Sequence, residues 1–178
     1  MVRALLDGSK TQTRRAVKLT ESGRVKEPGG YRRWYPADKQ AVLACPYGIP
    51  GGHLWVREAH WWFKDEHDPV TGYYPPKLTS DDVEYRADGD DGRTVWRPSI
   101  HMPRWASRIT LEITGVRVER LHDISWGDAM AEGCPFPNMA QGDDPRKWYA
   151  DLWNSISGPG SWDANPFVWV VEFKRVET

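Results

Sequence analysis

The sequence predicts an α+β fold in which a mostly antiparallel sheet curls into a small β-barrel flanked by helices. Apolar and polar residues alternate through Ile109, Leu111 and Ile113, as they do in a strand with one buried face. The stretch 167–176 is apolar enough for a central strand. The 178 residues contain no repeat and no linker, so we expect a single domain over residues 1–178.

Glycine and proline divide the N-terminal half of the chain into short elements. In order, we expect a helical turn over residues 1–7 that Gly8 ends, an extended excursion over 20–39, a turn over 45–52, a strand over 53–62, a loop over 65–82 and a short strand over 83–86.

The C-terminal half contains the longer elements. Alternation breaks at Gly115 within the strand expected over 109–121, which is typical of a bulge or a sharp bend. Residues 96–108 have the period of neither a strand nor a helix. Ser125 and Asp128 form an imperfect capping box at the start of a short helix that ends at Gly133. A second helix over 143–156 has an apolar stripe made of Trp148, Leu152, Trp153 and Ile156.

The net charge predicts no general electrostatic attraction to nucleic acid, because the 24 basic residues are balanced by 25 acidic residues. Arginines nevertheless gather in acid-poor patches. The chain has 11 tryptophans, and we expect most of them in the core and some on a stacking surface.

The two cysteines, Cys45 and Cys134, form no disulfide framework and no C-x-x-C motif. His60 and His67 have poor spacing for a metal pair, so we expect neither a metal nor another cofactor. Nothing resembles a signal peptide or a membrane span, which favours a cytoplasmic protein with reduced thiols.

The most informative motif lies in residues 8–15 and reads G-x-K-x-x-T-x-R, with Lys10, Thr13 and Arg15 as its polar members. An amine, hydroxyls and guanidiniums this close together suit an anionic or carbonyl-bearing ligand. A bare surface turn is the alternative.

This motif is followed by Gly52-His-Leu-Trp-Val56, by Ile124-Ser-x-x-Asp-Ala-x-x-Glu-Gly133 and by Val170-Val-Glu-Phe-Lys174. In that order, these segments resemble the ASCH domain family over essentially the whole chain, and the resemblance implies a PUA-like β-barrel. Segments 101–108 and 158–163 are similar to the larger phage-associated members. Members usually have an apolar strand before the first helix, whereas this sequence starts within that helix.

The ASCH pattern often has glutamate at the position of Thr13. The threonine form resembles the amidohydrolase branch, which removes acyl groups from the exocyclic nitrogen of cytidine derivatives such as N4-acetylcytidine. The resemblance implies Lys10, Thr13 and Glu132 as the catalytic set. Thr13 is the expected nucleophile, Lys10 is its general base, and Glu132 orients Lys10 or moves protons to the leaving amine.

Five further residues are candidates for binding the substrate: Arg15, Tyr47, Arg57, Arg104 and Arg108. Arg15 could stabilise an oxyanion, Tyr47 could stack on a base, and Arg104 and Arg108 could hold a phosphate. The structural alternative for the last two is that they solvate the edges of a buried Trp105.

Two other functions stay open. The same cleft could serve an RNA-binding PUA-like module or an ASCH-type ribonuclease. In the simplest alternative, Lys10 and Thr13 line a solvated loop, while Glu132 caps a helix or pairs with an arginine. The expected partners are therefore an acylated nucleoside or RNA, and no membrane.

Overall fold

The computed structural model describes residues 1–18, 24–27, 30–33, 45–62, 79–89, 92, 95–135 and 144–176. The chain divides into two compact units. Unit 1 contains residue 1, residues 3–54 and residues 111–176, and unit 2 contains residue 2, residues 55–110 and residues 177–178. The single domain expected over residues 1–178 stays a prediction. His67 and most of the loop expected over 65–82 lie outside the described residues.

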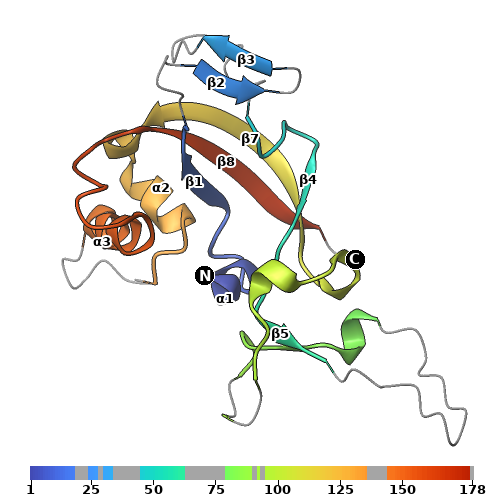
Figure 1. Cartoon of the computed structure of the whole chain (residues 1–178). Coiled ribbons are helices and arrows are strands. Elements are labelled where there is room, and N and C mark those ends of the chain that lie inside the picture. Colours follow the sequence, from blue (N-terminus) through green and yellow to red (C-terminus); the bar gives the residue numbers. More distant parts are fainter. Residues whose placement is uncertain are drawn as a thin grey trace, which may run out of the picture. The chain divides into compact units, whose positions relative to one another are not determined.

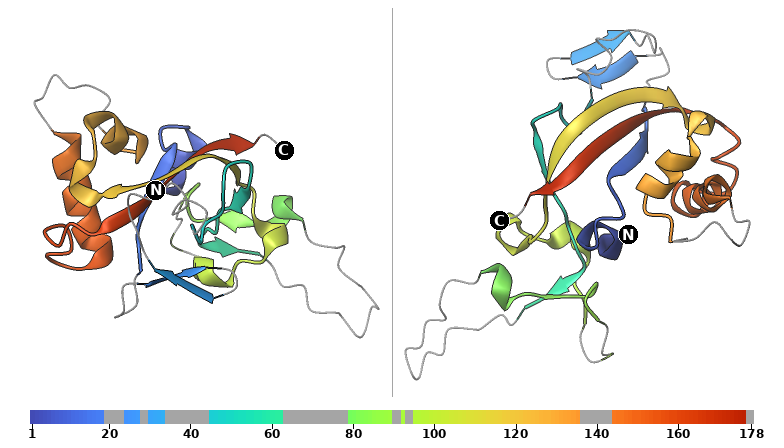
Figure 2. Two further views of the ribbon diagram at one scale, coloured as in Figure 1. Left: turned by 90° about the horizontal axis from the view of Figure 1, so that it is seen from above. Right: turned by 180° about the vertical axis from the view of Figure 1, so that it is seen from behind.

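Unit 1 is built on a curved antiparallel sheet with the strand order β1-β8-β7-β4 (Figure 1). Its strands are β1 (Gln12–Ala16), β8 (Phe167–Val176), β7 (Thr110–Arg120) and β4 (His53–Trp55). The strand expected at the C-terminal end is therefore confirmed. Figure 2 shows the long strands β7 and β8 side by side from two further directions. A separate antiparallel pair, β2 (Arg24–Glu27) with β3 (Gly30–Arg33), occurs within the expected excursion.

The two faces of the sheet have different cores. Trp169 and Val171 of β8 pack with Ile113 on one face, and Val168 and Val170 pack against the helices on the other. Because side chains alternate along β8, one strand supplies both cores. The sheet is therefore buried on both sides of β8.

Gly115 marks the expected break in alternation, although β7 continues through it. Ile113 and Val116 belong to the same cluster, which strict alternation would forbid. A Cβ atom on Gly115 would lie 2.6 Å from an oxygen of Glu172. This position thus combines a change of side-chain phase with a close approach of the neighbouring strand.

In the part of the chain that the structure describes, three α-helices accompany the sheet: α1 (Val2–Leu6), α2 (Trp126–Ala131) and α3 (Pro145–Ser157). All three lie where the sequence predicts them. Ser125 caps α2 by accepting a hydrogen bond from the Asp128 N–H at 3.0 Å. A 3₁₀ turn, η5 (Leu121–Asp123), joins β7 to α2.

The buried stripe of α3 differs from the prediction at two residues. Ile156 is 64% exposed, whereas Tyr149, absent from the predicted stripe, is only 3% exposed. Trp153 is buried as expected. The helix therefore turns Tyr149 and Trp153 toward the sheet and leaves its last turn open.

Unit 2 contains a short antiparallel pair, β5 (His60–Trp61) with β6 (Glu84–Tyr85), and three 3₁₀ turns. These turns are η2 (Ser80–Asp82), η3 (Ser99–His101) and η4 (Arg104–Ala106). The strand predicted over 53–62 is thus split into β4 and β5. Between them, the Glu58 N–H is directed to the sulfur of Met102. Among the described residues, no helix is long and apolar enough to cross a membrane.

Candidate functional site

The G-x-K-x-x-T-x-R motif enters the sheet as its edge strand. Lys10 pairs with Glu132 in an isolated β-bridge, and β1 then pairs with β8 from Gln12 onward. Lys10, Gln12 and Arg14 are 4%, 3% and 1% exposed, so every second residue is a buried polar one. Side-chain alternation places Thr13 and Arg15 on the opposite face of the strand.

Lys10 and Glu132 form a buried ion pair. Nζ of Lys10 donates to Oε2 of Glu132 at 2.7 Å and to the Glu132 carbonyl oxygen at 2.9 Å. Burial lowers the pKa of Lys10, and the charge of Glu132 opposes that effect only in part. Lys10 and Glu132, two members of the expected catalytic set that are distant in sequence, are therefore in direct contact.

Glu132 is held in place by the end of α2, of which it is the C-cap residue. Gly133 follows with φ of +90°, and a Cβ there would lie 3.2 Å from the Cβ of Lys10. A glycine at this point lets the chain turn beside Lys10 without a collision. The helix end thereby fixes the carboxylate against the first motif.

Arg14 is the second cation on Glu132, and the sequence analysis did not select it. Its guanidinium donates to Oε1 of Glu132 at 3.2 Å and lies 2.6 Å from a carboxylate oxygen of Glu119. It also lies 5.9 Å from the ring centroid of Tyr149. The alternative that Glu132 caps a helix and pairs with an arginine thus describes real contacts, in addition to its contact with Lys10.

The network of charges continues on the same side of the sheet. Arg117 pairs with Glu119 at 2.9 Å, with Asp128 at 2.6 Å and with Glu172. Gln12 donates to Asp128 at 3.1 Å. These ion pairs connect β1, β7, β8 and α2, and they hold the strand that contains the motif.

A pocket of about 340 Å³ opens beside β1. Its polar lining comes from Thr13, Arg14, Arg15, Glu132 and Tyr149. The remaining wall comes from α3, Ala16 and the N-terminal residue, namely Leu152, Trp153, Ile156, Ser157, Ala16 and Met1. Two residues of the predicted catalytic set, Thr13 and Glu132, therefore line one cavity with an apolar wall.

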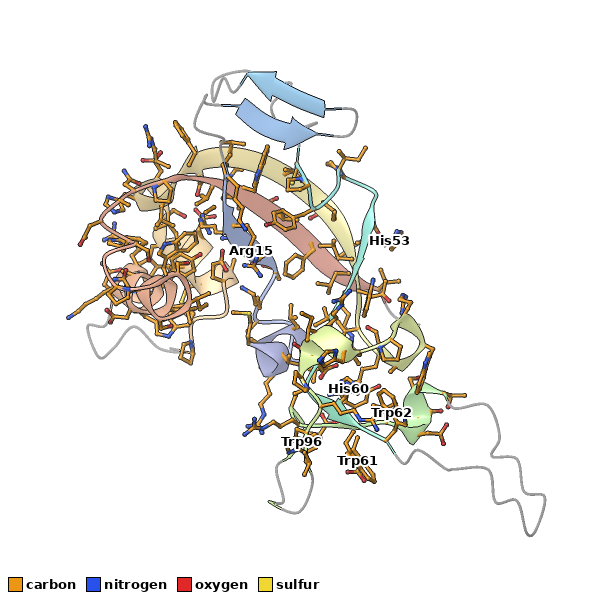
Figure 3. The ribbon with its side chains drawn as sticks, viewed as in Figure 1. Arg15, His53, His60, Trp61, Trp62 and Trp96 are labelled. Carbon is orange, nitrogen blue, oxygen red and sulfur yellow. The ribbon has the colours of Figure 1, made fainter. Side chains whose placement is uncertain are left out.

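Lys10 takes a different place from the one that its predicted role requires. Within the described residues, it does not line this pocket and makes no hydrogen bond to Thr13. Oγ1 of Thr13 instead accepts a hydrogen bond from Arg15 at 2.7 Å. Figure 3 shows the Arg15 side chain on β1. Direct proton transfer from Thr13 to Lys10 is not the arrangement seen.

Tyr149 is a pocket residue that the sequence analysis missed. Burial raises the pKa of its hydroxyl, and the neighbouring charge of Glu132 adds to the rise, so this hydroxyl stays protonated. The signal was present in sequence as an aromatic residue four before Trp153 on the same helical face. Arg14 had a comparable signal, because it continues the period of two from Lys10 and Gln12.

Tyr47 lies in unit 1 but does not line this pocket. It is partly buried and packs against the cluster that contains Trp169. Burial raises the pKa of its hydroxyl, and the positive charge of Arg15 opposes the rise. Its expected stacking on a base stays a prediction.

The other three candidate arginines belong to unit 2. Arg108 donates to both oxygens of Glu58 at 3.1 and 3.0 Å and to both oxygens of Asp88 at 2.8 Å. Its guanidinium is thus occupied by two carboxylates, and we no longer assign it to a phosphate. The guanidinium groups of Arg57 and Arg104, in contrast, lie over the indole ring of Trp55.

The described residues contain no group of three or more metal-ligating side chains. Trp105, which the structural alternative places in the core, is 40% exposed.

No protein-family model, no curated protein and no solved structure matches this chain.

Proposed function

We propose that unit 1 is an amidohydrolase of the ASCH type, with a PUA-like barrel, and that it removes acyl groups from the exocyclic amine of cytidine derivatives such as N4-acetylcytidine. One observation carries the proposal. Thr13 and Glu132, whose carboxylate is held by the buried Lys10, line the same pocket of about 340 Å³. A hydroxyl nucleophile with a nearby proton carrier is the minimum that acyl transfer through a covalent intermediate requires.

The roles that we propose differ from those implied by the sequence in one respect. Glu132 lines the pocket, whereas Lys10 contacts Glu132 from behind. Glu132 is therefore the group that exchanges protons with a ligand, and Lys10 is a positioning residue that holds its carboxylate. Arg15, 2.7 Å from Oγ1 of Thr13, stabilises negative charge that develops on that oxygen.

In the first step of the proposed reaction, Oγ1 of Thr13 bonds to the acyl carbon and the bond from that carbon to the exocyclic nitrogen breaks. The hydroxyl proton passes through Glu132 to the leaving nitrogen. In the second step, a water oxygen bonds to the acyl carbon and the ester bond to Oγ1 breaks. Glu132 returns a water proton to Oγ1, so one amide and one water give a carboxylic acid and an amine.

The test follows cytidine release from N4-acetylcytidine. We expect Thr13→Val to abolish release, and Glu132→Gln to lower kcat by about 10²- to 10⁴-fold. The matched control for the first is Thr11→Val, an exposed threonine two residues earlier. The control for the second is Glu112→Gln, a carboxylate paired with Lys174 at 3.0 Å.

Three outcomes decide between the candidates. Release of cytidine by the wild type, with an acyl group on Thr13 detected by mass spectrometry, supports the mechanism. Activity that survives Thr13→Val excludes the covalent step. Cleavage of single-stranded RNA without deacylation in a parallel reaction would favour the ribonuclease.

A further inference from the structure

A surface of unit 2 combines exposed arginines with tryptophans and takes no part in the proposed hydrolysis. The guanidinium carbon of Arg57 lies 4.7 Å from the ring centroid of Trp55, and that of Arg104 lies 5.9 Å from the same ring. The guanidinium of Arg97 lies 4.3 Å from the ring of Trp62. All of these residues lie within residues 55–110.

Two tryptophans of this surface, Trp62 and Trp105, are in contact with each other. The rings of Trp62 and Trp105 meet edge to face with centroids 5.2 Å apart, and Trp105 is 40% exposed. Figure 3 shows Trp61 and Trp62 next to β5, near His60. We call the set Trp55, Arg57, Trp62, Arg97, Arg104 and Trp105 the arginine–tryptophan surface.

The charges on this surface are not neutralised within the described part of the chain. Arg57 donates to the carbonyl oxygen of Ile100 at 3.4 Å, and Arg104 donates to the hydroxyl of Thr110 at 3.3 Å. Neither residue, nor Arg97, forms an ion pair with any described carboxylate. Arg108, four residues after Arg104, shows the contrast, because two carboxylates occupy it.

This difference indicates what the surface is suited to bind. A structural arginine in a folded protein is normally paired, as Arg108 is, whereas guanidiniums stacked on indole rings present their N–H groups to an external anion. Trp105, which follows Arg104 in the chain, leaves part of its indole ring exposed to a ligand. Phosphates joined to planar rings satisfy both features at once.

We propose that the arginine–tryptophan surface binds single-stranded nucleic acid, with a base stacked on Trp105 and the backbone phosphates next to Arg57 and Arg104. Because the whole chain has a net charge of −1, the affinity for nucleic acid comes mainly from stacking and from a few local phosphate contacts. This inference is independent of the proposed hydrolysis, because it uses none of the pocket residues.

The experiment measures binding of the whole protein to short fluorescent oligo-rU and oligo-dT by anisotropy. We expect Trp105→Ala to weaken binding by about 5- to 150-fold, the effect of losing one stacked base. The matched control is Trp126→Ala, because Trp126 is also 40% exposed but lies on α2 of unit 1. It should leave the affinity unchanged.

Salt dependence tests the cations separately. If Arg57 and Arg104 each contact one phosphate, the plot of log affinity against log salt should have a slope of about −1.4. The double variant Arg57→Ala/Arg104→Ala should bring the slope close to zero. Arg146→Ala, which removes one charge from an exposed pair with Asp144, is the control and should change neither slope nor affinity.

Several results would overturn the proposal. These are undetectable binding of both oligonucleotides, equal binding by the wild type and Trp105→Ala, or equal weakening by Trp126→Ala. Competition by polyglutamate as strong as by oligonucleotide would show a site for acidic protein segments instead. If Trp105→Ala fails to fold, as judged by circular dichroism, the exposed arginine variants still decide. A preference for rU or dT then identifies the polymer.

Discussion

At the scale of single residues, the centre of unit 1 is a set of charges that water scarcely reaches. Lys10 and Arg14 are almost fully buried, and both contact the carboxylate of Glu132. Two buried cations would be unstable without such partners, because an unpaired charge in the interior costs several kcal/mol. Burial lowers the pKa of Lys10. Because burial also shields Lys10 and Arg14 from water, both cations need the negative charge of Glu132 to compensate their own charge.

Asp128 leads to a prediction about acid stability. Burial raises its pKa, but hydrogen bonds from Ser125 and Gln12 and the charge of Arg14 outweigh that effect and hold the pKa well below its usual value. In an unfolded chain, the pKa of an aspartate is about 3.9. The stabilisation is therefore complete above that pH and is lost as the pH falls toward the lower pKa of the folded state.

We expect Asp128→Asn to lower the unfolding free energy by about 2 kcal/mol near neutral pH, the value of hydrogen bonds to a charged group. The difference from the wild type should shrink as the pH falls below about 3.9, the unfolded pKa, which urea titrations at several pH values would measure. Asp151→Asn, at an exposed position on α3, is the control and should have little effect. A difference that stays constant with pH would contradict the assignment.

At the scale of elements, alternation divides the side chains of β1 between its two faces. Its even-numbered residues Gln12 and Arg14 join the buried charges, while Thr13 and Arg15 face the other side. The sequence predicted the motif correctly as the feature that brings Lys10 to Glu132. It did not predict that Lys10 and Thr13 diverge, because no strand was predicted at residues 12–16 and side-chain direction is fixed only once a strand forms.

Gly133 allows a prediction about how α2 meets β1. Gly133→Ala should lower the unfolding free energy by about 2–4 kcal/mol, from its positive φ and from overlap with Lys10 and Ala4. Gly8→Ala should cost only about 1–2 kcal/mol, because its φ is also positive but no atom lies within 4 Å of the added Cβ. Equal losses in urea unfolding would show that the contact with Lys10 is unimportant.

At the scale of the whole molecule, each unit has a core of its own. Unit 1 has the two clusters on either side of β8, and unit 2 has a cluster of Val83, Tyr85, Met102 and Ala106. The buried Glu58, 1% exposed, adds its pair with Arg108 to unit 2. Because the two cores are separate, we expect a substitution that destabilises one unit to cause local unfolding in that unit alone.

We therefore expect Glu58→Gln to destabilise unit 2 by about 2 kcal/mol, because it weakens charged hydrogen bonds. Hydrogen exchange should accelerate in residues 79–89 and 95–110 and stay unchanged in β1 and β8. Glu84→Gln, at an exposed site on β6, is the control. Equal acceleration in β1 and β8 would mean that both units unfold as one.

The sequence by itself determined the local elements. Caps, glycines and an apolar stripe indicated α1, α2 and α3, alternation indicated β7 and an apolar run indicated β8, because these signals act between residues a few positions apart. Only the tertiary structure decided which polar groups are buried together. Arg14 with Glu119, Tyr149 beside Glu132, and Arg108 between Glu58 and Asp88 are contacts between residues distant in sequence. Such contacts depend on strand register and helix rotation, which the burial of the whole sheet fixes.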